Sequence, residues 1–244
     1  MKGIILAGGK ATRLRPLTLI TSKQLLPVYN KPMVFYPIET LIKAGIKDIL
    51  VIVAPDYPGQ YLKLLGSGKE FGARFTYEIQ EEANGLAEAF IIGEKFVGKD
   101  NVALILGDNI FEHDFSEDIK SFESGALTFV KKVHDPQRYG VVEFDESMKV
   151  LSIEEKPEHP KSEYASVGFY VYDHRVCEIA KNLKPSKRGE IEINGNPSVN
   201  NTFLEMGELQ ARIIDGMWED AGTFDSLLRV NNFMAEKAKQ AAGE

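Results

Sequence analysis

Short apolar runs alternate with amphipathic segments through the first half of the chain. Runs rich in Ile, Val and Leu are typical of buried strands, and strict alternation of apolar and polar residues is typical of a half-buried one. The predicted strands are residues 2–7, 46–54, 74–80 and 102–106, and the predicted helices are residues 37–44, 60–65 and 85–96. Strands that alternate with helices favour a mostly parallel sheet covered by helices on both faces.

The second half of the chain changes character, because turn-rich loops rather than helices separate its strands. Strands are predicted at residues 126–132, 139–144, 150–155 and 164–172, followed by a helix at 175–183. A last helix is predicted to start near Thr223, which is a suitable N-cap. We therefore predict one continuous α/β domain, in which antiparallel or mixed strands extend the sheet and form a second wall of the site.

Polar or glycine-rich segments follow three of the predicted strands directly. They are Gly8-Gly9, Gln80 and residues 107–109, whose sequence is Gly-Asp-Asn. Ligands of parallel sheets bind at the carboxyl ends of the strands. The three segments are therefore expected to lie at one binding edge.

Charge is distributed unevenly along the 244 residues. The formal net charge is −7, yet no acidic residue precedes Glu39. The cations of residues 1–38 are Lys2, Lys10, Arg13, Arg15, Lys23 and Lys31. An acidic protein is a poor partner for nucleic acid, whereas a local concentration of cations indicates a pocket for a small polyanion.

Several features bear on the compartment. Cys177 is the single cysteine, so no internal disulfide can form, which fits a reducing cytoplasm. The longest apolar run, residues 49–54, is too short to cross a bilayer. Glycines and a lysine interrupt the first apolar run, so no signal peptide is evident. We expect a cytoplasmic protein without a membrane partner.

The first glycine pair opens a segment that runs through Lys10, Ala11 and Thr12 to Arg13. Adjacent glycines let backbone N–H groups approach phosphate oxygens, and an arginine adds a bidentate donor. The segment matches neither the P-loop nor the Gly-x-Gly-x-x-Gly pattern. A tight turn is the alternative interpretation, but Arg13, Lys23 and the missing acids favour a phosphate loop.

A series of motifs along nearly the whole chain resembles the sugar-nucleotide pyrophosphorylases. The matching segments are residues 3–9, 13–18, 22–27, 31–33, Gln80 with 85–87, 106–109, 139–141, 154–157 and 218–223. The resemblance implies a Rossmann-like, mostly parallel mixed sheet of the glycosyltransferase-A-like nucleotidyltransferase type, with an added β-rich sugar-binding lobe. It divides the single domain 1–244 into a nucleotide-binding part (about 1–125), a sugar-phosphate-binding part (about 126–222) and a C-terminal helix (223–244).

The family joins a nucleoside triphosphate to a sugar 1-phosphate and releases pyrophosphate. The likeness is greatest to the members that use dTTP and glucose 1-phosphate, which implies a place in dTDP-rhamnose and polysaccharide biosynthesis. A sugar phosphate is largely dianionic at neutral pH and can attack the α-phosphorus directly. The resemblance further implies Mg²⁺ as cofactor and a homodimer or homotetramer.

Residue roles are implied by the same resemblance. Arg13 would stabilise the departing pyrophosphate, Lys23 would contact the phosphates from the opposite side, and Lys156 would hold the sugar phosphate. The metal would be bound by Asp108 and Asp220, and Asp108 would also be a catalytic residue. The nucleotide would be bound by Leu6, Gly8, Gly9, Thr12, Arg13, Lys23, Gln24, Gln80 and Gly85, and the sugar by Asn109, Tyr139, Gly140, Glu155, Lys156 and Val167.

The chain departs from the family pattern in places. Ala11 stands where the phosphate loop usually has glycine, Glu81 to Asn84 lack the usual proline, and the segment around Asn194–Ser198 is replaced and lengthened. Most of these departures bear on base or sugar rather than phosphate. The C-terminus is shorter than in the longer members, so weaker or absent end-product regulation at a second nucleotide site is expected. Trp218 is interpreted as a core residue.

Three other functions stay open. The first is a uridylyltransferase that makes UDP-glucose or UDP-N-acetylglucosamine, since one methyl group discriminates weakly between bases. The second is a non-catalytic sugar-nucleotide-binding module, against which the presence of Arg13, Asp108, Lys156 and Asp220 argues. The third, a dinucleotide-dependent dehydrogenase, lacks the glycine fingerprint.

Overall fold

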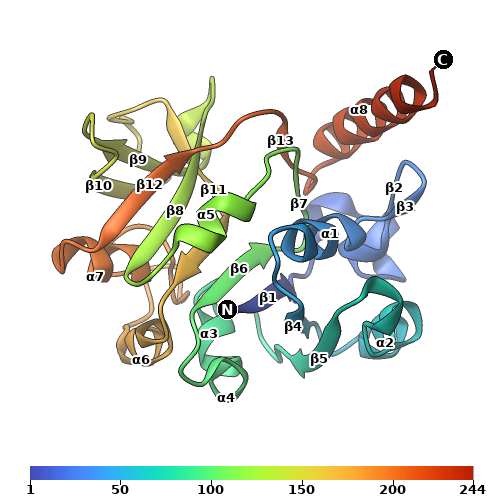
Figure 1. The fold of residues 1–244 in the computed structure, drawn as a ribbon, viewed down its shortest axis with the longest axis horizontal. Coiled ribbons are helices and arrows are strands. Elements are labelled where there is room, and N and C mark those ends of the chain that lie inside the picture. Colours follow the sequence, from blue (N-terminus) through green and yellow to red (C-terminus); the bar gives the residue numbers. More distant parts are fainter. Residues whose placement is uncertain (244) are drawn as a thin grey trace.

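The computed structural model describes residues 1–243 and is built on a nine-stranded sheet (Figure 1). Its first half consists of the neighbouring strands β6, β1, β4 and β5, all parallel. Their bounds are Val102–Leu106, Lys2–Ala7, Asp48–Val53 and Arg74–Ile79. The predicted parallel sheet is confirmed for this half of the chain.

The second half of the sheet is mixed, as the sequence predicted. Strand β11 (Tyr164–Tyr172) pairs antiparallel with β6, β8 and β9, and β12 pairs parallel with β8. The remaining bounds are Ala126–Lys132 for β8, Gly140–Phe144 for β9, Val150–Glu155 for β10 and Leu209–Ile213 for β12.

Helices cover both faces of the sheet, and the side chains of each strand alternate between two cores. In β1, Ile4 and Leu6 belong to one hydrophobic cluster while Ile5 and Ala7 belong to the other, as the two-residue period of a strand requires. The helices are α1 Phe35–Lys43, α2 Pro58–Leu65, α3 Glu88–Ile92, α4 Glu94–Val97, α5 Ser116–Ser121, α6 Arg175–Asn182, α7 Val199–Glu205 and α8 Phe224–Ala242.

Two small ribbons complete the fold. Strand β7 (Asn109–Phe111) pairs antiparallel with β13 (Trp218–Asp220), and β2 (Pro27–Val28) pairs with β3 (Lys31–Pro32). Helix α8 follows β13 directly and projects from the body at the upper right of Figure 1. Its predicted start is confirmed, because Thr223 and Ser226 form a reciprocal capping box.

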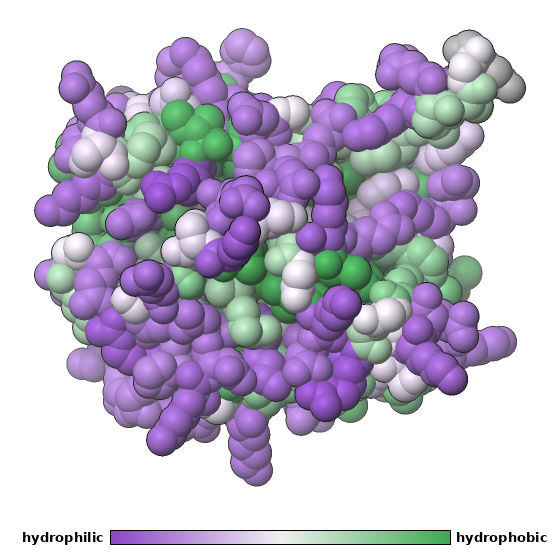
Figure 2. Space-filling view, in the orientation of Figure 1, coloured by the Kyte–Doolittle hydropathy of each residue, from purple (hydrophilic) through white to green (hydrophobic). Residues whose placement is uncertain are grey.

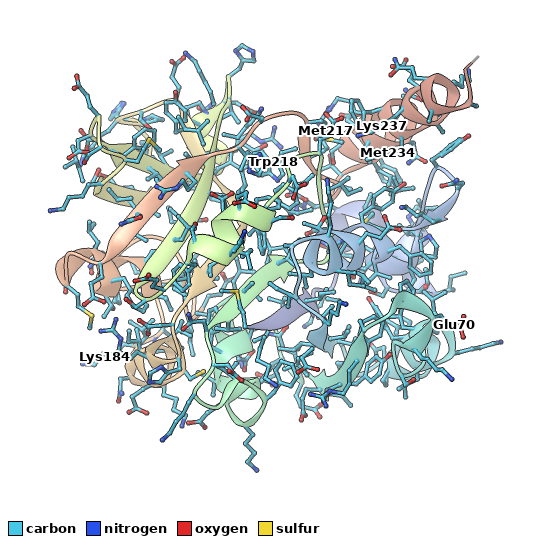
Figure 3. All side chains as sticks on the ribbon, viewed as in Figure 1. Glu70, Lys184, Met217, Trp218, Met234 and Lys237 are labelled. Atoms are coloured by element: carbon cyan, nitrogen blue, oxygen red, sulfur yellow. The ribbon has the colours of Figure 1, made fainter. Side chains whose placement is uncertain are left out.

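Helix α8 rests on a third, smaller hydrophobic cluster. Val230 of the helix is buried there beside Val28 and Ile110, and Met217 and Met234 pack against the same cluster. Figure 3 shows Met217 close to Met234 and Lys237, where the elements meet. The helix therefore packs against the ribbon of β7 and β13.

Several element predictions need correction. The single helix expected at 85–96 is divided into α3 and α4 at Gly93, and its first residues are a loop in which Gly85 has a φ of 110°. Helix α1 begins two residues before the predicted start. The sequence reading did not find α5, α7, β7, β12 or β13. Helix α7 contains Asn200, Asn201 and Thr202, which are weak helix formers, and it depends on the N-cap Ser198.

The surface in the orientation of Figure 2 is mostly hydrophilic, with apolar side chains confined to small areas. Within residues 1–243, no helix combines the length and the apolar character that spanning a membrane would need.

Candidate active site

The phosphate-loop candidate leaves the carboxyl end of β1 at the binding edge of the sheet. Gly8, Gly9, Lys10 and Ala11 line a cavity of about 230 Å³ here. Ala11 holds a φ of 47°, the left-handed conformation that glycine adopts most easily. The alanine therefore keeps the loop in a glycine-like conformation at a cost in backbone strain.

Arg13 and Thr12 lie in the short 3₁₀ turn that follows, at Thr12–Leu14, and both are exposed. Arg13 faces a second cavity that also contains Asp220. A Cβ placed on Gly222 would lie 2.8 Å from both Arg13 Nη2 and Asp220 Oδ1. The arginine and this aspartate therefore converge on the same glycine, although they are far apart in the sequence.

The nucleotide-pocket candidate adjoins the loop and has a volume of about 200 Å³. Its lining includes six of the predicted nucleotide residues: Leu6, Gly9, Lys23, Gln24, Gln80 and Gly85. It shares Gly9, Gln80 and Ala83 with the phosphate-loop cavity. The two cavities therefore form adjacent parts of one recess.

Two positions of this recess are occupied by glycine because neighbouring atoms leave no room for a Cβ. A Cβ on Gly8 would lie 2.3 Å from Gln80 Oε1, and a Cβ on Gly85 would lie 2.4 Å from the carbonyl oxygen of Ile191. Gly85 also has a positive φ, which disfavours other residues. Both positions therefore bring backbone against the atoms that shape the pocket.

Lys23 and Asp108, which both line the nucleotide pocket, form a mostly buried ion pair. Burial opposes charge on Asp108, but the Lys23 ammonium and the Asn109 amide hold the pKa of Asp108 below its usual range. Burial likewise lowers the pKa of Lys23, but the two aspartates outweigh it and raise that pKa. Both groups are thus charged at neutral pH.

Asp220 is the second carboxylate of this cluster. Burial and the negative charge of Asp108 raise the pKa of Asp220 to about 6. The ribbon brings the two together, because Asp220 pairs with Asn109 across β13 and β7, and the Ala221 nitrogen donates to the Asp108 carbonyl at 2.9 Å. Two carboxylates whose negative charges lie this close are the kind of oxygen ligands that divalent cations prefer.

The sugar-pocket candidate, also about 200 Å³, lies on the other side of Leu86 and Leu106, which it shares with the nucleotide pocket. It is the same cavity that Arg13 and Asp220 line, and the predicted sugar residues in its lining are Asn109, Tyr139, Gly140, Glu155 and Lys156. Burial raises the pKa of Glu155, against the opposing charges of Lys156 and Arg188. The Lys156 ammonium lies 3.6 Å from the Glu155 carboxylate.

Lys156 follows β10 with a φ of 47°, so a second non-glycine residue of the site occupies the left-handed region. Its side chain is about half exposed. Its backbone N–H donates to the Tyr139 carbonyl at 2.9 Å, which fixes the turn that directs the lysine out of the sheet. Backbone strain of this kind is frequent at functional sites.

Some candidate residues take other positions than the sequence suggested. The Val167 side chain is fully buried in the hydrophobic core, while Ser166 and Gly168 line the sugar pocket. Any contact of Val167 with a sugar therefore involves its backbone. Trp218 is not a plain core residue, since it lines the pocket and donates from Nε1 to Asn109 Oδ1 at 2.7 Å.

Sequence reasoning also missed residues that border the site. Arg138 and Asn194 line the sugar pocket, and Glu190 lines the nucleotide pocket. Arg188 lies 3.9 Å from Glu155 and 2.9 Å from Glu192. The unusual segment around Asn194 was noticed in the sequence, but its place beside the sugar pocket depends on tertiary contacts.

A family model described as nucleotidyl transferase matches residues 2–237. The chain belongs to the nucleotidyl transferase family. It is 50% identical over 240 residues to the glucose-1-phosphate thymidylyltransferase of Neisseria meningitidis serogroup A, and 51% identical over 239 residues to that of Mycolicibacterium smegmatis. Each alignment covers 96% of this chain and 82% of the relative.

Solved structures of the nucleotidyl transferases agree with this assignment. A Bacillus anthracis protein described as a glucose-1-phosphate thymidylyltransferase, in complex with sucrose, superimposes with a TM-score of 0.89 at 44% identity. The match covers 96% of this chain and 94% of that protein. A UDP-glucose pyrophosphorylase complexed with UDP-glucose reaches 0.85 at 22% identity over 97% and 98% of the two chains, which shows the shared fold alone.

Proposed function

We propose that the protein transfers the thymidylyl group of dTTP to glucose 1-phosphate, giving dTDP-glucose and pyrophosphate. The observation that carries this is its identity of about 50% to glucose-1-phosphate thymidylyltransferases over 96% of the chain. The geometry supports it, since cations and carboxylates line two adjoining pockets of about 200 Å³ each.

The reaction is a direct displacement. A phosphate oxygen of glucose 1-phosphate attacks the α-phosphorus, and the bond between that phosphorus and the bridging oxygen to the β-phosphorus breaks. The bonding electrons leave with pyrophosphate, so no covalent enzyme intermediate is required. Catalysis then depends on positioning two polyanions in line and stabilising the charge that develops.

Three cations line the two pockets. Lys156 and Arg13 both line the sugar pocket, together with Asp220; Lys156 would hold the attacking phosphate and Arg13 would stabilise the departing pyrophosphate. Lys23, paired with Asp108 in the lining of the nucleotide pocket, would neutralise phosphate oxygens from the other side. Gln80 and Gly85 border the space for the base.

We propose Mg²⁺ as the cofactor, held by Asp108 and Asp220. Carboxylates are hard oxygen donors, and burial and the Asp108 charge raise the pKa of Asp220, so a bound cation would stabilise its charged form. Within residues 1–243, no group of three or more His, Cys, Asp or Glu side chains is arranged to hold a metal ion by itself, so phosphates and water would supply the other ligands. When bound, the ion neutralises phosphate charge and aligns the two substrates.

The test is pyrophosphate release with Mg²⁺ and glucose 1-phosphate, comparing dTTP, UTP, ATP, CTP and GTP. We expect a preference for dTTP that EDTA or Asp108→Asn abolishes. A preference for UTP would support the uridylyltransferase alternative with the same residue roles. Absence of release with every nucleotide and with N-acetylglucosamine 1-phosphate would contradict the proposal. Light scattering of the same sample tests the expected homodimer or homotetramer.

A further inference from the structure

The amide of Gln80 is held from one side by a carboxylate. Gln80 Nε2 donates to Glu88 Oε2 at 2.7 Å, and Asn84 Nδ2 donates to Glu88 Oε1 at 2.9 Å. The Asn84 backbone N–H also points at Glu88 Oε2, at 3.4 Å. Both carboxylate oxygens of Glu88 are therefore engaged, and Gln80 itself is only 4% exposed.

The chemistry of the partner decides which way this amide points. A carboxylate only accepts hydrogen bonds, so the Gln80 atom that faces Glu88 must be nitrogen. Within residues 1–243, no hydrogen-bond donor reaches Gln80 Oε1. Every fully buried side-chain oxygen or nitrogen in that range has a hydrogen-bond partner, so Oε1 is not fully buried. Oε1 is therefore accessible from the recess that Gln80 lines, where it lies against Gly8.

The loop between Gln80 and Glu88 is itself restrained. The Ile191 nitrogen donates to the Asn84 carbonyl at 2.6 Å, and the Ala87 nitrogen donates to the Ile191 carbonyl at 3.1 Å. Gly85, between them, approaches Ile191 so closely that no Cβ fits. Glu88, the first residue of α3, thus contacts Gln80 directly after a loop whose conformation the Ile191 backbone fixes.

We propose that Glu88 is a positioning residue that determines base specificity by preventing rotation of the Gln80 amide. The inference rests on the proposed function and on Gln80 facing the base. Held in this orientation, Gln80 presents an oxygen acceptor and one remaining N–H donor to the pocket. The pocket then selects nucleotides whose base carries a hydrogen on N3 next to a carbonyl oxygen, which are thymine and uracil, and rejects cytosine.

The rejection of cytosine follows from its ring. Its N3 is an acceptor beside an amino group, so it would place a lone pair against Gln80 Oε1 and a donor against the remaining N–H. A freely rotating amide would turn over and bind cytosine equally well, because it carries a donor and an acceptor. Mispaired buried polar groups discriminate far more strongly than a methyl group does.

The experiment compares kcat/KM for dTTP, dCTP and dUTP in the wild type and in Glu88→Gln. The glutamine variant keeps the size of the side chain but supplies both an acceptor and a donor, so either orientation of Gln80 is tolerated. We expect the dTTP-to-dCTP ratio to fall at least about tenfold through a gain with dCTP. The dTTP-to-dUTP ratio should not change, because both bases carry N3–H.

Two further variants make the test decisive. Asn84→Ala removes the side-chain hydrogen bond to Glu88 Oε1. It should lower the dTTP-to-dCTP ratio too, but by less than Glu88→Gln does. Glu82→Gln changes an exposed glutamate of the same loop and should leave it unchanged. Equilibrium binding of dTTP and dCTP to each variant, with melting temperatures, separates specificity from folding.

An unchanged dTTP-to-dCTP ratio in Glu88→Gln would overturn the inference, as would an equal loss with all three nucleotides. A wild-type enzyme that turns over dTTP while the variant stays selective contradicts only the role of Glu88. A wild type that binds dTTP but releases no pyrophosphate contradicts the proposed function instead.

Discussion

Trp218 Nε1 donates a hydrogen bond of 2.7 Å to Asn109 Oδ1. The same oxygen accepts from the Gly168 backbone at 3.2 Å, and the Asn109 amide nitrogen donates to Asp108 Oδ1 at 3.1 Å. The Asn109 amide thus has its oxygen turned to the indole and its nitrogen turned to the carboxylate. Trp218 thereby orients the residue that orients Asp108.

Trp218→Phe should lower kcat about tenfold. The substitution removes one of the two donors to Asn109 Oδ1 and leaves only the Gly168 N–H. The Asn109 amide is then held less firmly toward Asp108, and a hydrogen bond to a charged group contributes about 1.5–3 kcal/mol. Steady-state pyrophosphate release measures the effect. Tyr77→Phe removes a side-chain donor to Gly66 at the far edge strand β5 and should leave kcat unchanged. A wild-type kcat in Trp218→Phe would contradict this role.

Ala11→Gly should raise the free energy of unfolding by up to about 1.5 kcal/mol. The left-handed φ of 47° costs alanine about 1–2 kcal/mol, from which the greater unfolded-chain entropy of glycine subtracts about 0.4–1 kcal/mol. Urea denaturation checks the sign. The same exchange at Ala235, inside α8, should destabilise the protein by about 0.5–1 kcal/mol; destabilisation at both positions would contradict the strain at Ala11.

Lys156→Met should reduce kcat/KM for glucose 1-phosphate by a factor of about 10²–10³, because it removes the cation beside the sugar pocket. The affinity for dTTP should change little. Kinetics at varied glucose 1-phosphate and equilibrium binding of dTTP measure the two effects separately. Lys161→Met is the matched control, since Lys161 pairs with Glu154 on the surface at 2.6 Å. Equal losses in both variants would argue against a role for Lys156.

Cys177 should resist thiol reagents in the folded protein. Burial raises the pKa of this thiol to about 11, so roughly one molecule in a thousand carries the reactive thiolate at pH 8. We expect modification by a disulfide reagent to be at least about a hundredfold slower than in urea. Rapid modification of the native protein at one site per chain would show that Cys177 is accessible.

Asp173→Asn should destabilise the protein by about 2 kcal/mol at pH 7. Burial acts to raise the pKa of Asp173, but hydrogen bonds from Arg175 and the Gly125 backbone outweigh it and lower that pKa below 3.8. The stabilisation is therefore present above the ordinary pKa and is lost as the pH falls below it. Urea midpoints of wild type and variant should converge in acid. A constant difference from pH 7 to pH 3 would refute the linkage.

Local pattern was sufficient for the strands of the sheet other than β12. Residues 2–7 and 102–106 form buried strands, as continuous apolar runs predict. Pattern failed where contacts distant in sequence decide the conformation. The segment 85–87 is a loop because the Ile191 backbone binds it, and β7 and β13 are too short to produce a periodic signal and exist through their mutual pairing.

The sequence by itself determined the alternation of strands and helices, the cationic N-terminal segment and the motifs that carry the family resemblance, since each depends on neighbouring residues. Only the tertiary structure decided three contacts. Strand pairing in the ribbon of β7 and β13 places Asp108 beside Asp220, Trp218 donates a hydrogen bond to Asn109, and Glu88 accepts one from Gln80. These relationships depend on direction and on burial. The pattern of apolar and polar residues along the chain cannot specify them, because folding brings together residues that are far apart in the sequence and share no periodicity.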